Sequence, residues 1–202
     1  MPATASRERR RYWVLGSVAS EGQPFVVADI ETFCRWRGNP ATKVKTAAVL
    51  RAGRALVWNT QAGGSTSRVL LPRRGQRAGL VLMYCEPNDE AGFDAARAAV
   101  EEAKGIERQI GRLRVRGDAL VISNADTCGA DLVREGAAPA RTLIAAARLR
   151  PPIPLHSRAF EHQGLLVPVE PGAYVVTAGA KSGPSFTCRF IRLEAPADPS
   201  KR

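Results

Sequence analysis

Side chains that could act as nucleophiles or metal ligands are few and widely spaced in this chain of 202 residues. The cysteines are Cys34, Cys85, Cys128 and Cys188, and the histidines are His156 and His162. Since no two of them have the spacing of a CxxC pair or a zinc finger, we expect neither a metal site nor a cofactor. The spacing leaves open a Cys–His pair that only the fold would bring together.

The surroundings of the cysteines separate one from the other three. Cys34, Cys85 and Cys188 lie in apolar-patterned segments, where cysteine behaves as a small hydrophobe. Cys128 lies in a polar segment and is the one thiol that we would test for reactivity. Because no orienting motif accompanies it, we expect a protein that is not an enzyme and has no catalytic residue.

A glycine- and hydroxyl-rich stretch at residues 59–68 invites comparison with a phosphate-binding loop. It contains Gly63-Gly64-Ser65-Thr66-Ser67 but lacks the Gly-Lys-Ser/Thr ending, and no helix pattern follows it. We therefore interpret it as a connection between strands. Its neighbours Trp58 and Arg68 are residue types that anchor protein interfaces when exposed.

Positive charge is concentrated in one part of the chain. The net charge is +11, and residues 32–85 carry ten basic side chains and no acidic one, whereas residues 86–102 are acidic. Such a basic segment fits either phosphates or an acidic protein surface. Most of the basic residues are arginines, a bias that a GC-rich genome would also produce.

Alternating apolar residues and glycine turns predict strands joined mainly as hairpins. We expect hairpins over residues 12–27, 49–58 and 113–122. Residues 80–84 are apolar throughout, which is typical of a strand buried on both faces. The last hairpin echoes the middle one, and two ordinary glycine turns explain the likeness.

Helix signals are fewer and lie between the strand patterns. Asp29 is a suitable N-cap for a short helix ending at Gly38, and either Asn88 or Asp89 can cap a helix over residues 89–104. A further helix is expected over residues 138–150. The predicted fold class is α+β, with a mainly antiparallel twisted sheet of hairpins and two or three short helices.

The extent of the domain follows from the same patterns. We expect a flexible basic tail at residues 1–11, one α+β domain at 12–194 and a flexible tail at 195–202. No apolar run approaches membrane-spanning length, and no apolar stretch after the N-terminal arginines could form a signal peptide. We therefore expect a cytoplasmic protein without membrane contact.

Short motifs along most of the chain resemble the immunity protein 21 family of bacterial polymorphic-toxin systems. The similar positions are Trp13, Ser20-Glu21-Gly22-Gln23-Pro24-Phe25-Val26-Val27, Trp36-Arg37-Gly38, Ala55-Leu56-Val57, Ser65-Thr66-Ser67, Leu70-Leu71-Pro72, Tyr84, Ala119-Leu120-Val121 and Pro171-Gly172-Ala173-Tyr174. The chain departs from the family where Gly22-Gln23-Pro24 replaces Gly-Gly-Pro, and in its strong positive charge.

The resemblance implies a binding protein that neutralises a cognate toxin by direct protein–protein contact. The basic charge then points to an acidic surface on that toxin, or to a toxin that is not a nuclease. Partner-binding anchors are expected among the aromatic and arginine residues of the basic segment, namely Trp36, Trp58, Arg68, Arg73 and Arg74. The alternative is a nucleic-acid-binding module that uses residues 32–85.

Overall fold

The computed structural model describes residues 12–20, 22–37, 43–61, 65–72, 78–102, 107–117, 119–126, 153–155 and 164–195. Several predicted features lie outside these described residues. They are Arg73, Arg74, Cys128, His156, His162, the helix over residues 138–150 and the tail at residues 1–11.

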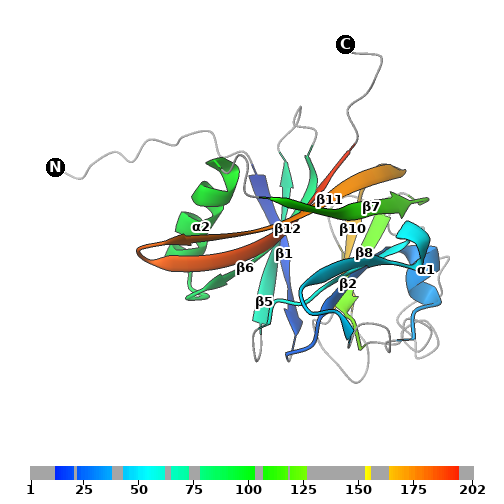
Figure 1. Ribbon diagram of the computed structural model, residues 1–202, viewed down its shortest axis with the longest axis horizontal. Helices are drawn as coiled ribbons and strands as arrows, with labels where there is room; N and C mark the ends of the chain where they lie inside the picture. Colours follow the sequence, from blue (N-terminus) through cyan, green and yellow to red (C-terminus); the bar gives the residue numbers. More distant parts are fainter. Residues whose placement is uncertain are drawn as a thin grey trace, which may run out of the picture.

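The described strands form two six-stranded sheets, in which every pairing is antiparallel (Figure 1). The first sheet contains, in spatial order, β1 (Tyr12–Ser20), β5 (Ser65–Pro72), β6 (Ala78–Glu86), β12 (Phe186–Glu194), β11 (Gly172–Gly183) and β7 (Arg108–Val115). The second contains β3 (Ala47–Leu50), β4 (Ala55–Trp58), β2 (Phe25–Asp29), β8 (Ala119–Asn124), β10 (Gly164–Pro168) and β9 (Ile153–Leu155). The prediction of a mainly antiparallel, strand-rich fold is confirmed, but the strands divide between two sheets.

Two α-helices of the described chain lie at opposite sides of the molecule, with the sheets between them (Figure 1). They are α1 (Ile30–Cys34) and α2 (Glu90–Glu102). In α1, the Asp29 carboxylate accepts a hydrogen bond from the Thr32 N–H at 2.7 Å. In α2, Asp89 accepts from the Gly92 N–H at 2.7 Å. The N-cap predicted at Asp29 is therefore confirmed, and of the two candidates Asn88 and Asp89 it is Asp89 that caps α2. None of the described helices has the length and apolar character needed to cross a bilayer.

Three apolar clusters hold the layers together. Because side chains alternate across a strand, most of the inner strands contribute to two of these clusters. In β6, Leu80 and Leu82 belong to the large cluster between the sheets, whereas Val81 and Met83 pack under α2 with Phe93. The prediction that residues 80–84 form a strand buried on both faces is confirmed. A third cluster joins α1 and Trp36 to the outer face of the second sheet.

Two of the three predicted hairpins are wrong. The strand β1 pairs with β5, while β2 pairs with β4 and β8 in the other sheet. Similarly, β7 pairs with β11, and β8 pairs with β2 and β10. In both cases the connection passes from one sheet to the other, because both strands bury apolar side chains in the cluster between the sheets. The hairpin of β3 and β4 is confirmed.

A buried polar network attaches the C-terminal end of α2 to the first sheet. The Arg192 guanidinium lies 2.9 Å from a Glu107 carboxylate oxygen and donates to the Val100 carbonyl at 3.1 Å. The Thr177 hydroxyl donates to the other Glu107 oxygen at 2.6 Å. A cation at this end of the helix also complements the helix dipole.

The phenol of Tyr84 should make stability depend on pH in the alkaline range. Burial, followed by the hydrogen bond that its hydroxyl donates to Glu86, raises the pKa of Tyr84 to about 12. Between pH ~10 and ~12 the unfolded chain ionises this phenol while the folded chain keeps its proton. The free energy of unfolding should therefore fall as the pH rises through this window. Urea unfolding at about pH 9 and about pH 11 measures the effect. Between these two pH values the free energy of unfolding should fall less for Tyr84→Phe than for the wild type. Equal losses would contradict the assignment.

Candidate interface at two stacked sheet edges

Two of the predicted anchors are buried rather than exposed. Trp36 has no exposed surface, and its indole N–H donates to the Ala125 carbonyl at 2.6 Å. Trp58 is 3 % exposed and lies in the cluster between the sheets, with its ring centroid 6.0 Å from that of Phe25. Each ring fills a gap between layers of the fold, so neither tryptophan lies at the surface where a partner could contact it directly.

Arg68 also packs within the fold. Its guanidinium carbon lies 3.9 Å from the centroid of the Phe93 ring, which places it between β5 and α2. This contact is on the outer face of the first sheet, whereas Trp36 packs on the outer face of the second. The described anchors therefore do not form one surface. Arg73 and Arg74 lie outside the described residues, so their role stays a prediction.

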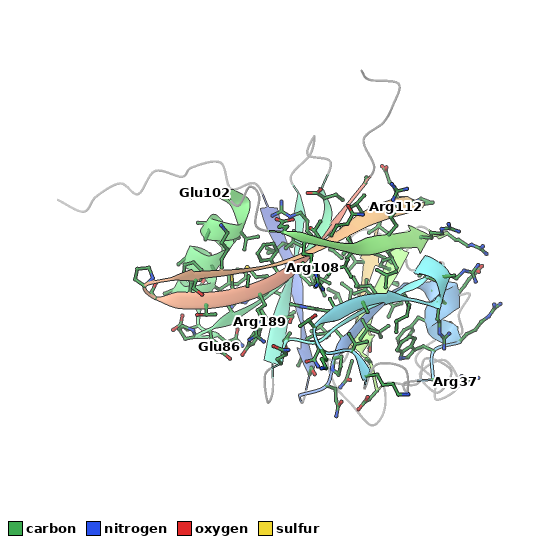
Figure 2. The ribbon with its side chains drawn as sticks, in the orientation of Figure 1. Arg37, Glu86, Glu102, Arg108, Arg112 and Arg189 are labelled. Atoms are coloured by element: carbon green, nitrogen blue, oxygen red, sulfur yellow. The ribbon has the colours of Figure 1, made fainter. Side chains whose placement is uncertain are left out.

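A different basic surface lies where the edge strands of the two sheets stack. β3 and β7 are edge strands of the two sheets, and they lie against each other. A methyl group placed on Gly111 of β7 would lie 3.2 Å from the Val49 side chain of β3. In Figure 2, Arg112 of β7 lies on the side of the molecule that also carries α1 and Arg37. Residues about sixty positions apart in the chain are thus neighbours.

The turn between β3 and β4 joins these two edges. Arg51, Ala52 and Gly53 form the 3-10 turn η2 (Arg51–Gly53) with φ values of 52°, 54° and 88°. A Cβ atom on Gly53 would lie 3.0 Å from the Arg112 carbonyl oxygen, so the turn rests directly on the backbone of β7. Only glycine combines this backbone conformation with such a close approach.

Arg51 connects the same turn to α1. Its guanidinium carbon lies 5.1 Å from the centroid of the Trp36 ring, and one of its N–H groups donates to the Arg35 carbonyl at 3.3 Å. Cation–π packing of this kind stabilises an arginine against an aromatic face. The left-handed backbone of the turn is therefore held by contacts on both sides.

Ala52 provides a direct test of strain in this turn. A non-glycine residue pays about 1–2 kcal/mol to adopt the left-handed conformation. Ala52→Gly should therefore raise the free energy of unfolding by about 1 kcal/mol, after the entropic cost of glycine is subtracted. The control is Ala48→Gly in the extended backbone of β3, which should lower stability. Urea denaturation measures both, and a loss of stability in Ala52→Gly would contradict the expectation.

Two open hollows flank this arrangement. The larger, of about 900 Å³, is lined by Lys43, Val44, Lys45, Thr46, Ala47, Ala48, Leu50 and Arg51. The smaller, of about 390 Å³, is lined by Val49, Ala52, Gly53, Ile110, Gly111, Arg112, Arg114 and Ala173. All charged residues in these two linings are basic, and the remaining lining is largely apolar. We name the combined surface the β3–β7 surface.

The hollows lie on the two faces of β3. Ala48 and Leu50 line the larger hollow, whereas Val49 lines the smaller one. The positions of Ala48, Val49 and Leu50 follow the alternation of side chains along a strand, whereas Ala47, at the start of β3, also lines the larger hollow. Local sequence patterns could not reveal the surface, because Arg112 and Arg114 lie outside the basic segment 32–85. The only local signal was the glycine turn with flanking arginines at residues 51–54.

Nucleophilic and metal-binding chemistry has little support among the described residues. They contain no group of three His, Cys, Asp or Glu side chains placed to hold a metal ion. Cys85 and Cys188 are buried, as their apolar surroundings predicted. Burial raises the pKa of the Cys188 thiol to about 11, which disfavours the thiolate at neutral pH.

Comparison of the chain with protein-family models, curated proteins and solved structures gives no match in any of the three. The resemblance to the immunity protein 21 family therefore stays a prediction from the residues that carry it.

Proposed function

We propose that this chain is an immunity-type binding protein that neutralises a cognate bacterial toxin through direct contact at the β3–β7 surface. The observation that carries the proposal is the charge of the two hollows, whose titratable lining residues are all basic. Such a surface complements an acidic region of a partner protein. The class of partner, a bacterial toxin, is what the resemblance to the immunity protein 21 family implies.

The chemistry of the surface favours a protein partner. Arg112 and Arg114 border an apolar floor that includes Val49 and Ile110. Arginines around a small apolar centre are typical of residues that dominate protein–protein binding energy. A planar guanidinium can also bind a carboxylate through two parallel hydrogen bonds.

Nucleic acid is the competing partner, since basic side chains also bind phosphates. Single-stranded nucleic acid usually binds with bases stacked on exposed aromatic rings. Trp36 and Trp58, the described tryptophans of the basic segment, are both buried. This observation disfavours single-stranded nucleic acid as the partner, and a duplex is left for the experiment to test.

Co-expression provides the test of the proposal. The proposal expects a toxin gene beside the gene for this chain, and the probe is the toxin domain that such a gene encodes, expressed in bacteria with and without the chain. We expect restored growth, and calorimetry of the purified pair should show one-to-one binding. Failure to bind or to restore growth would overturn the proposal. So would tight binding to a short DNA or RNA duplex whose affinity falls steeply with salt.

A further inference from the structure

We infer that the acidic partner enters the β3–β7 surface as an extended segment that pairs with the free edge of β3 and adds a strand to the second sheet. The inference depends on the proposed function for the identity of the partner. The mode of binding follows from the backbone of β3 and the residues around it.

One long edge of β3 has no partner strand among the described residues. In the spatial order of the second sheet, β3 is terminal and pairs only with β4. The Thr46 carbonyl accepts from the Asn59 N–H at 2.6 Å, and the Leu50 carbonyl accepts from the Arg54 N–H at 3.1 Å. Both carbonyls therefore point toward the β4 side.

Backbone groups alternate in direction along an antiparallel strand. Because Thr46 and Leu50 direct their carbonyls toward the β4 side, the intervening odd-numbered residues direct theirs away from it. The N–H and C=O groups of Ala47 and Val49 are therefore the ones that an added strand would meet. Main-chain pairing of this kind supplies affinity when an extended peptide docks on a sheet edge.

The two hollows would receive the side chains of the added strand. Successive side chains of a strand point to opposite faces, so alternate residues would enter the hollow beside Leu50 and the hollow beside Val49. Lys45 and Arg51 line the first hollow, and Arg112 lines the second. Carboxylates on either face of the added strand would therefore meet a cation.

The same charges disfavour a second copy of this chain as the occupant. Pairing of two β3 edges would bring the lysines and arginines of both copies together, and like charges that face each other destabilise paired strands. Basic residues beside an exposed edge are also a usual protection against edge-to-edge association. An acidic segment from another protein could both hydrogen-bond to the edge of β3 and place its carboxylates beside the basic residues.

The first probe is a capped peptide of alternating residues, Glu-Val-Glu-Val-Glu-Val-Glu-Val, with its lysine counterpart as the control. Fluorescence anisotropy should show that the glutamate peptide binds and that the lysine peptide binds at least about tenfold more weakly. Ala47→Pro removes one outward N–H at the first position of an edge strand, where proline is tolerated. It should weaken binding about tenfold, whereas Ala47→Ser, which keeps the N–H, should not.

A second measurement on the wild-type chain does not depend on how the variants fold. Amide exchange followed by NMR should slow at Ala47 and Val49 when the glutamate peptide is added. No binding of this peptide, equal binding by Ala47→Pro and Ala47→Ser, or unchanged exchange at both amides would overturn the inference.

The tests of strand addition and of the proposed function can fail separately. If the chain restores growth against the toxin but the peptide does not bind, strand addition at β3 is wrong and the immunity function stands. If the peptide binds and slows exchange at Ala47 and Val49 but the toxin is not neutralised, the docking edge stands and the immunity function is wrong.

Discussion

Reversal of charge at Arg112 and Arg114 is expected to lower the affinity for the acidic partner by at least ~100-fold. Both arginines line the smaller hollow, and both residues are exposed, so we expect their replacement to leave the core of the fold intact. In Arg112→Glu/Arg114→Glu, two carboxylates would face the partner's own carboxylates. Like charges brought together in an interface cost several kcal/mol, which exceeds the loss of the original attraction alone.

Calorimetry with the toxin domain and anisotropy with the glutamate peptide both measure this effect. The matched control is Arg108→Glu/Lys181→Glu, which changes the net charge by the same amount outside the lining of both hollows. We expect the control to keep affinity within about threefold at physiological salt, because charges at the protein surface that are separated by more than a Debye length are largely screened. If both double variants lose affinity equally, net charge rather than the β3–β7 surface governs binding.

Removal of Arg192 is expected to lower the free energy of unfolding by about 3–5 kcal/mol. Arg192→Leu leaves the largely buried Glu107 carboxylate without its cation, and the Val100 carbonyl loses a donor. A buried charge without a partner is far more costly than the absence of the whole pair. The end of α2 should then separate from β11 and β12 more easily.

The double variant Arg192→Leu/Glu107→Leu distinguishes this mechanism from a simple loss of packing. Because it removes both charges, it should recover a large part of the stability lost in the single variant. Urea denaturation monitored by circular dichroism gives all three values. A double variant less stable than Arg192→Leu would contradict the assignment of Glu107 as the uncompensated charge.

Local sequence signals predicted the parts of the fold that depend on nearby residues. The carboxylates of Asp29 and Asp89 cap helices only three residues away from the N–H groups that they bind. The turn at residues 51–54 and the uninterrupted apolar run at 80–84 are equally local. Each of these signals acts within one turn or one strand, so no distant part of the chain is needed to interpret it.

The same local patterns did not predict which distant segments of the chain pack against each other. The chain itself determined a strand-rich antiparallel protein with capped helices and an excess of positive charge. Only the tertiary structure decided that β1 and β2 belong to different sheets, and that Trp36 and Trp58 face inward. It also placed the turn before Arg54 against Arg112. Alternation along a strand shows that one face is buried, but the surface that buries it is contributed by segments far away in the sequence.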